Sequence, residues 1–284
     1  MRVPFRLVDV FAERPFAGNQ LCVVPEPVDL DMAAMQSVAR EIGFSETTFV
    51  TEVRADGYSM RLFTPDQELP FAGHPTIGTA FVMVSEGRVP SPLTQVVAAG
   101  EIPVEVDVER NHAWMQQLPP AFDEEFPDPE GAANAAGLSV EDLHPGMPPQ
   151  VVSTGLRHLL APVVDLGTLK RAFRNPEVLA GLAADHRLDA LYLFALTDEG
   201  ATARMFDPAL EIGEDPATGS AAGPLGAYLA SRGAGGMPGR ILVRQGEQVG
   251  RPSLLEVEVA PEGESWRVMV GGGVFVVGSG AFEL

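Results

Sequence analysis

Two short strings in the sequence have the composition of a helix start that can hold an anion. The first is HPTIGTA, residues 74–80, and the second is DPATGSA, residues 215–221. Proline suits the first position of a helix, where its missing N–H is not needed, and the small residues that follow let a ligand approach the backbone. Because a helix N-terminus offers unpaired N–H groups and a partial positive charge, each string is expected to bind an anionic group such as a small carboxylate.

The two strings belong to an internal repeat. The pattern R-x-F-x-P-x-x-E occupies residues 61–68 and returns at residues 204–211, and X-P-x-x-G-[ST]-A follows each copy. A carboxylate, Glu46 or Asp189, stands at the same distance before each arginine. The chain is therefore expected to be a duplicated half, with two similar domains related by a pseudo-twofold axis and both helix starts facing one cleft between them.

Matched positions in the two copies carry different chemistry, His74 against Asp215 and Glu46 against Asp189. Such divergence is what an asymmetric substrate would favour. Each residue also has a structural interpretation. His74 is typical of a capping or surface histidine, Asp215 of an N-cap that satisfies helix N–H groups, and Glu46 of a strand-end carboxylate.

Other residues are expected to do structural work. Arg61 and Glu68 recur as Arg204 and Glu211, which favours an ion pair across each sheet. Cys22, between two apolar neighbours, is expected to be a buried small hydrophobe.

Hydrophobic periodicity indicates an α+β fold. Amphipathic helices are expected at 31–42 and 176–185, each between strands. The segments 76–84 and 217–230 are apolar almost all round and are expected as buried central helices, the second kinked or delayed by Pro224. Each domain is thus predicted to be a curved, mostly antiparallel sheet wrapped around one helix. The predicted boundaries are 1–118, a Pro-rich acidic connection at 119–149, and 150–284, whose last strand is a candidate for crossing back to the first domain.

Composition excludes several classes of function. Of 284 residues, 39 are acidic and 19 basic, for a net charge of −20 without a basic cluster, so neither nucleic acid nor membrane is an expected partner. A single cysteine excludes an intrachain disulfide and a cysteine-based zinc site, and the histidines lack metal-ligand spacing. The protein is therefore expected to bind no metal. Because it has no long apolar stretch, it is expected to be cytoplasmic.

Five strings together resemble the PhzF family, the phenazine-biosynthesis isomerase-like proteins that share the diaminopimelate epimerase-like fold. They are VDVF at 8–11, FAGN at 16–19, SETTF at 45–49, FAGHPT at 71–76 and EDPATGSA at 214–221. They occur in order, and the resemblance covers essentially the whole chain. It implies a cofactor-free isomerase with two pseudo-symmetric domains, an active site between them, and a homodimer.

The resemblance also implies individual roles. Glu46 would be the general acid/base that takes and returns the proton, with His74 and Asp215 around the amino and hydroxyl groups of the substrate. Further hydrogen bonds to the substrate, several of them to its carboxylate, would come from Asn19, Ser45, Gly73, Gly219 and Ser220.

The expected function is a cofactor-independent isomerase that moves a proton on a small carboxylated substrate, with a cyclic amino or hydroxy acid as the model, through one carboxylate. The epimerase relatives use two cysteines near the starts of the two central helices, which this chain lacks, so inversion by two thiols is not available. Two alternatives stay open: an isomerase or epimerase of another amino or hydroxy acid, and a non-catalytic interaction protein that keeps the fold.

Overall fold

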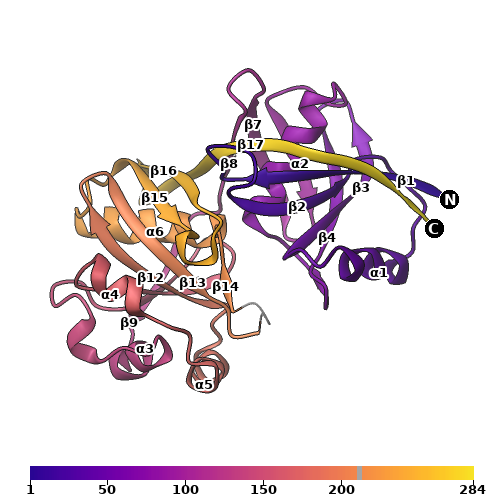
Figure 1. Ribbon diagram of the computed structural model, residues 1–284. Coiled ribbons are helices and arrows are strands. Elements are labelled where there is room, and N and C mark those ends of the chain that lie inside the picture. Colours follow the sequence, from indigo (N-terminus) through magenta and orange to yellow (C-terminus); the bar gives the residue numbers. More distant parts are fainter. Residues whose placement is uncertain (210–212) are drawn as a thin grey trace. The chain divides into compact units, whose positions relative to one another are not determined.

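The structure, a computed structural model, describes residues 1–209 and 213–284. The chain divides into two compact units. Unit 1 comprises Met1–Gln116 together with Gly271–Leu284, and unit 2 comprises Gln117–Val270. Both units contain strands and helices (Figure 1), and the fold class is α+β as predicted.

Unit 1 is built on a curved sheet. Its neighbouring strands run in the order β17-β1-β2-β3-β4-β6-β7-β8, β8 also pairs with β17, and β5 forms a short hairpin on β4. Two pairs, β2–β3 and β4–β6, are parallel and the other pairs with a printed register are antiparallel. The strands are β1 (Arg2–Val10), β2 (Asn19–Val24), β3 (Glu46–Arg54), β4 (Gly57–Phe63), β5 (Glu68–Leu69), β6 (Leu93–Val97), β7 (Gly100–Asp107), β8 (His112–Gln116) and the end of β17 (Ser265–Glu283).

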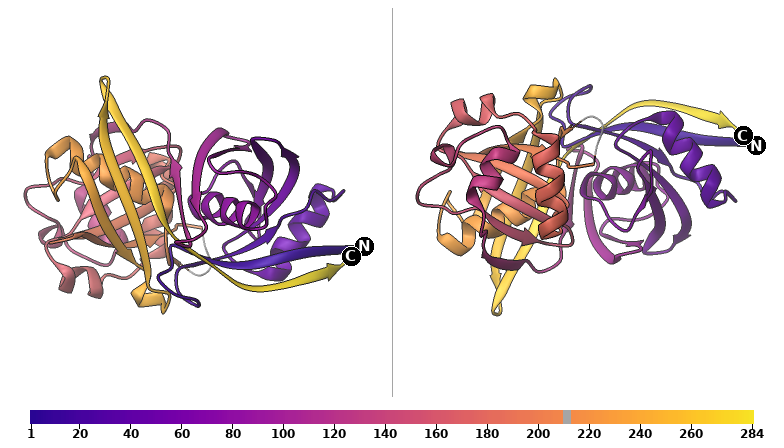
Figure 2. Two further views of the ribbon diagram at one scale, coloured as in Figure 1. Left: turned by 90° about the horizontal axis from the view of Figure 1, so that it is seen from above. Right: turned by 90° about the horizontal axis from the view of Figure 1, so that it is seen from below.

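Helix α2 (Gly73–Ser85) is the centre of unit 1, and the strands curve around it (Figure 2). Eleven of its residues are buried, as its lack of a polar stripe predicts. Gly78 makes the close packing possible, because a Cβ there would lie 2.6 Å from Leu21 and 2.7 Å from Val10 on the sheet. The N-terminus of α2 is thereby held firmly against β1 and β2.

Helix α1 (Met32–Ile42) lies on the outside of unit 1 and follows its sequence signals closely. Asp31 is the N-cap and accepts a hydrogen bond of 2.8 Å from the N–H of Ala34. Gly43 ends the helix in the left-handed conformation at φ 67°. The apolar face buries Met35 and Val38 against the sheet.

Unit 2 repeats this plan. Its strands run β9-β10-β11-β12-β13-β15-β16-β17, with β14 as a short hairpin on β13. The strands are β9 (Ala121–Glu125), β10 (Gln150–Ser153), β11 (Arg157–Pro162), β12 (Ala190–Thr197), β13 (Gly200–Phe206), β14 (Glu214–Asp215), β15 (Gly239–Gln245), β16 (Ser253–Glu262) and the start of β17. The helices are α3 (Pro129–Ala135), α4 (Leu166–Arg171), α5 (Pro176–His186) and α6 (Gly219–Arg232), with 3-10 turns η1 (Val140–Asp142) and η2 (Glu247–Val249).

The strand directions repeat from one unit to the other. From β1 to β7 the successive pairs are antiparallel, parallel, antiparallel, parallel and antiparallel. From β10 to β16 the same five directions occur in the same order. Helix α6 takes the place of α2 and packs against β16, β10, β11 and β15.

The boundaries differ from those expected in one respect. Residues 119–149, expected as a connection, carry β9, α3 and η1 and belong to unit 2. Ala132, Ala133 and Leu138 enter the same apolar cluster as Leu191 of β12. The acidic and proline-rich composition of this segment hid the small alanine face by which it packs.

The end of the chain belongs to unit 1. Strand β17 leaves unit 2 at Val270 and pairs with β1 along Val274–Glu283. The N–H of Leu284 then donates a 2.8 Å hydrogen bond to the carbonyl of Met1. Gly271 lacks a side chain where a Cβ would lie 2.4 Å from the ring of Trp114. This glycine therefore permits a close approach of strand and ring.

Both repeated arginines are ion-paired with a glutamate. Arg61 donates to both carboxylate oxygens of Glu68 at 2.7 and 2.6 Å. Arg204 donates to both oxygens of Glu214 at 2.9 and 2.5 Å. Glu211, the partner predicted by the repeat, lies outside the described residues. Each glutamate pairs across its hairpin with a phenylalanine of the longer strand, so Glu214 is the structural counterpart of Glu68.

The helix starts also correct the alignment of the two strings. Gly73 and Gly219 are the first residues of α2 and α6, so His74 corresponds to Ser220. The string match aligned His74 with Asp215, which lies in β14 before the helix. An extra length of chain after β13 displaces the DPATGSA string relative to its helix, and sequence spacing alone did not reveal it.

The prolines of the two strings therefore play different parts. Pro75 lies in the first turn of α2, where its missing N–H is tolerated. Pro216 precedes α6, so the expectation that it begins the helix is wrong. Pro224 lies inside α6, which starts before it. It lacks the N–H that would bond the carbonyl of Ser220.

Candidate active site

A carboxylate and an imidazole face each other in unit 1. Glu46 Oε2 lies 3.2 Å from His74 Nε2, and the two side chains are 15% and 5% exposed. Glu46 is the first residue of β3, and His74 is the second residue of α2. The structure thus brings together two residues predicted to act on the substrate.

Two further predicted site residues, Asn19 and Ser45, form hydrogen bonds on the other side of the His74 ring. The amide nitrogen of Asn19 lies 3.2 Å from His74 Nδ1, and the hydroxyl of Ser45 donates to the Asn19 amide oxygen at 3.2 Å. Because an amide N–H can only donate, Nδ1 is the acceptor and the ring proton of neutral His74 is on Nε2. His74 then presents an N–H to the carboxylate of Glu46.

The fold explains why these four side chains meet. β2 and β3 are parallel neighbours, so their N-terminal ends lie at one edge of the sheet. Asn19 begins β2, Glu46 begins β3, and α2 starts at this edge with Gly73. The N-cap of α2 is Ala72, which has no side-chain acceptor, so no side chain of the cap covers the first N–H groups of the helix.

The remaining predicted residues lie in unit 2, around the start of α6. Asp215 is 8% exposed, and its carboxylate accepts a 2.5 Å hydrogen bond from the hydroxyl of Thr218. Thr218, and not Asp215, is the N-cap of α6, and its side chain makes no capping bond to the helix. The interpretation of Asp215 as the N-cap is therefore wrong.

Polar side chains of unit 2 hold this helix start in place. Gln245 bridges it, accepting from the N–H of Thr218 at 3.2 Å and donating to the carbonyl of Asp215 at 2.8 Å. Gln117 donates to the carbonyl of Gly219 at 2.8 Å. His158 Nε2 lies 3.1 Å from the hydroxyl oxygen of Ser220. The start of α6 is thus supported from the sheet side by long polar side chains.

Sequence reasoning missed these supporting residues. Gln117, Thr218 and Gln245 are ordinary polar residues in the sequence, and nothing in their spacing marks them. His158 carries a signal, since it is a single polar residue at the head of an apolar strand run. Metal-ligand spacing does not reveal a histidine whose partner is the hydroxyl of a serine.

The one cysteine is not a candidate base. Cys22 is fully buried in β2, as predicted, and burial raises the pKa of its thiol to about 12. A thiol with that pKa stays protonated at neutral pH and is a poor proton acceptor. The predicted acid/base chemistry therefore depends on carboxylate and imidazole groups.

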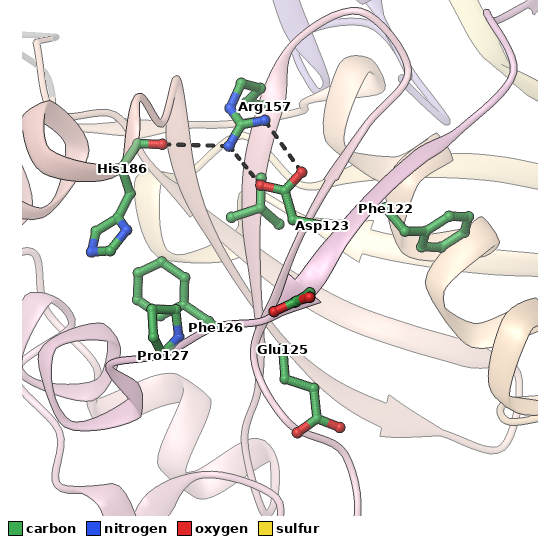
Figure 3. Close-up of a pocket in the computed structure, with 9 residues that line it drawn as sticks. Phe122, Asp123, Glu125, Phe126, Pro127, Arg157 and His186 are labelled. Atoms are coloured by element: carbon green, nitrogen blue, oxygen red, sulfur yellow. Dashed lines mark hydrogen bonds and ion pairs between the residues drawn. The ribbon is translucent and has the colours of Figure 1, made fainter.

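A surface cavity of about 490 Å³ lies elsewhere in unit 2 (Figure 3). Its wall carries Asp123, Glu124 and Glu125, and its arginine, Arg157, is paired with Asp123 at 2.7 Å. None of the eight predicted site residues lines it. An anionic substrate would meet three carboxylates there, so this cavity does not fit the predicted chemistry.

Two further findings bear on the expected partners. Within residues 1–209 and 213–284, no group of three His, Cys, Asp or Glu side chains is arranged to hold a metal ion. In the same part of the chain, every helix is too short or too polar to cross a membrane.

Comparison with known proteins identifies the family. The family model described as phenazine biosynthesis-like protein, PhzC-PhzF, matches residues 8–280. The chain belongs to the PhzC-PhzF family. Its resemblance to this family, inferred from five short strings, is confirmed, and the chain is an isomerase of the family.

Relatives of this PhzC-PhzF protein cover it almost completely. The trans-2,3-dihydro-3-hydroxyanthranilate isomerase of Pseudomonas chlororaphis is 33% identical over 283 residues, 98% of each chain. An uncharacterized isomerase of Pasteurella multocida is 34% identical over 287 residues, 97% of this chain and 92% of that one. The crystal structure of a PhzF-family phenazine biosynthesis protein from Bacillus anthracis is similar with a TM-score of 0.90 at 27% identity, covering both chains fully.

Proposed function

We propose that this PhzF-family isomerase moves a proton between two carbons of a small carboxylated substrate, with Glu46 as its general acid and base. The observation that carries the proposal is the contact of 3.2 Å between Glu46 and His74 at the start of α2. A carboxylate that is mostly buried, retains some exposure and lies 3.2 Å from an imidazole nitrogen is suited to take up and return a proton.

The proton balance needs no other reactant. A C–H bond of the substrate breaks, its electron pair delocalises into the conjugated system, and the proton forms an O–H bond on Glu46. That O–H bond then breaks as the proton is delivered to a different carbon on the same face. One carboxylate suffices, whereas inversion of a stereocentre needs bases on both faces. Since Cys22 is buried and protonated, no thiol supplies the second base.

The other predicted residues take supporting roles in this proposal. His74 orients the carboxylate of Glu46, and Asn19 with Ser45 selects its Nε2–H tautomer. The N–H groups at Gly73 and Gly219 and the hydroxyl of Ser220 would donate to the substrate carboxylate and stabilise charge that develops on it. Asp215 would bind an amino or hydroxyl group.

The substrate class is proposed by analogy with the Pseudomonas chlororaphis relative, whose name gives trans-2,3-dihydro-3-hydroxyanthranilate. A cyclic acid that carries amino and hydroxyl groups would offer a partner for each of these proposed roles. We further propose that the enzyme works without a cofactor and as a homodimer, with neither nucleic acid nor membrane as a partner. Another amino or hydroxy acid is the second candidate, because the curated relatives include isomerases without a stated substrate.

The proposal is tested by proton exchange in deuterated buffer with trans-2,3-dihydro-3-hydroxyanthranilate. We expect the wild type to introduce deuterium into the product and Glu46→Gln to lower both turnover and exchange by about 10²–10⁴-fold. Glu46→Gln should still bind the acid, since the amide is isosteric with the carboxylate. Undiminished exchange by this variant would remove Glu46 from the mechanism.

A further inference from the structure

His158 occupies a buried position behind the start of α6 that the proposed mechanism does not use. It lies in β11, is 1% exposed, and its Nε2 is 3.1 Å from the hydroxyl oxygen of Ser220. Ser220, the second residue of α6, is 6% exposed. Within the described part of the chain, its hydroxyl has no hydrogen-bonding partner other than this imidazole.

The surroundings of His158 determine where its proton lies. Complete burial lowers the pKa of the imidazole to about 4, so the ring is neutral at pH 7 and carries one N–H. Among the described residues Nδ1 has no hydrogen-bond partner. A proton on Nδ1 would leave a buried N–H donor unsatisfied, which is rarer and more costly than an unsatisfied lone pair. The proton is therefore on Nε2, which donates to Ser220.

This direction decides what Ser220 can do. A serine hydroxyl has one proton to donate and lone pairs that accept. If the oxygen of Ser220 accepts from His158, its own proton is directed away from the imidazole and is available to a ligand at the N-terminus of α6. In the opposite arrangement, the Ser220 hydroxyl would donate its proton to the imidazole, and only the lone pairs of its oxygen would face the ligand.

The duplication shows that packing does not require a histidine here. His158 is the Cα partner of Ala190, the first residue of β12. By strand register Glu46 corresponds to Ala190, and the match of Glu46 with Asp189 from spacing is wrong, because Phe49 and Leu193 are the partners of the two repeated arginines. The unit 1 position opposite Glu46 holds Leu21, which is fully buried. A buried imidazole with one unsatisfied nitrogen is costlier than leucine. That unit 2 has a histidine where unit 1 has a leucine favours a functional role for His158.

We propose that His158 is a positioning residue that holds the Ser220 hydroxyl with its proton directed at the carboxylate of the substrate. This inference rests on the proposed function for the identity of the ligand. The direction of the hydrogen bond does not depend on it, so the two can be tested separately.

The first experiment reads the hydrogen bond directly. In protein labelled with ¹⁵N at histidine, two-bond ¹H–¹⁵N correlations distinguish the two neutral tautomers and the imidazolium. His158→Gln identifies the signal by its loss. We expect the neutral Nε2–H tautomer at pH 7, and an Nδ1–H tautomer would overturn the proposal, because Nε2 could then only accept from Ser220.

The second experiment measures the consequence for the substrate. With trans-2,3-dihydro-3-hydroxyanthranilate, we expect Ser220→Ala and His158→Leu each to raise KM about 10-fold or more, with kcat changed far less. The double variant should be no worse than either single variant, because both remove one interaction. His158→Gln, which keeps an N–H donor near the same place, should recover most of the loss.

Two controls separate positioning from a general loss of structure. Ser231→Ala removes a hydroxyl from the last turn of the same helix, where it bonds the carbonyl of Tyr228, and should leave KM unchanged. Thermal unfolding of His158→Leu reports stability independently of KM. Additive effects of His158→Leu and Ser220→Ala, or a His158→Leu enzyme with normal KM, would refute the positioning role.

Failure of the proposed function would look different. If the wild type neither turns over this acid nor binds 3-hydroxyanthranilate in a calorimetric titration, the proposed substrate is wrong. The ¹⁵N spectrum then still decides the direction of the hydrogen bond, and an Nδ1–H signal would overturn the inference by itself.

Discussion

The carboxylate of Glu46 and the imidazole of His74 are in contact although one begins a strand and the other lies in the first turn of a helix. Their 3.2 Å separation is set by two rigid elements, the parallel pair β2–β3 and the central helix α2. The exposed 15% of the Glu46 side chain distinguishes it from His74, at 5%. A substrate can therefore reach the carboxylate while the imidazole supports it from behind.

Shortening this carboxylate tests whether its position matters as much as its charge. Glu46→Asp keeps the acid but withdraws it from His74 by one methylene. We expect kcat to fall about 10²-fold, because displacement of a catalytic group by about 1 Å has effects of that size. Steady-state kinetics of Glu46→Asp and Glu46→Gln side by side provide the measurement. Equal activities of Glu46→Asp and wild type would mean that the contact with His74 does not position the base.

The tautomer of His74 is tested at Asn19. In Asn19→Asp the new carboxylate can only accept, which draws the ring proton to Nδ1 and leaves Nε2 as a lone pair facing Glu46, or makes the ring cationic. We expect kcat to fall more in Asn19→Asp than in Asn19→Leu, which only removes a partner. Histidine ¹⁵N spectra should show the change at Nε2. A neutral ring that keeps its proton on Nε2 in Asn19→Asp would refute this assignment of the proton.

Much of the fold was predictable because local signals and tertiary structure agree. Asp31 and Gly43 delimit α1, and the all-round apolar runs mark α2 and α6 as central helices. The duplication was visible in the repeated arginine motif, and the arginine of each copy pairs with a glutamate, Glu68 in unit 1 and Glu214 in unit 2. In these places the sequence carries the physical cause of the structure within a few residues.

The failures lie where distant contacts decide. The alanine-rich segment at 119–149 looks like a linker until it packs against unit 2. The chain length between β13 and α6 shifts Asp215 from the helix start to β14, so a string match could not establish its counterpart. His158 and Gln117 act through contacts with residues far away in sequence, and no spacing rule reveals them.

The two repeated ion pairs should differ in their effect on stability. Arg204 and Glu214 are 8% and 10% exposed, whereas Arg61 and Glu68 are 32% and 28% exposed. Removing one partner of a buried pair leaves an uncompensated charge and costs about 3–5 kcal/mol, while an exposed pair contributes about 0–1 kcal/mol. Urea unfolding should therefore show Arg204→Met to be far less stable than Arg61→Met. Similar losses in the two variants would contradict this difference in burial.

The buried His158 should make the protein less stable in mild acid. Its pKa is lowered to about 4 in the folded protein, from an ordinary value of 6.5. Between these two values the unfolded chain binds a proton that the folded chain does not, so unfolding free energy rises with pH, by about 1.4 kcal/mol for each pH unit. His158→Leu removes this contribution. It should therefore gain roughly 2 kcal/mol relative to wild type when the pH is lowered from 7 to 5.

Urea unfolding of both proteins at pH 7, 6 and 5 measures this gain, because the other titrating groups are common to the two and cancel in the difference. If wild type and His158→Leu lose stability in parallel on acidification, His158 takes up its proton as easily in the folded protein as in the unfolded chain. That outcome would contradict the burial from which the neutral ring and its single proton on Nε2 were inferred.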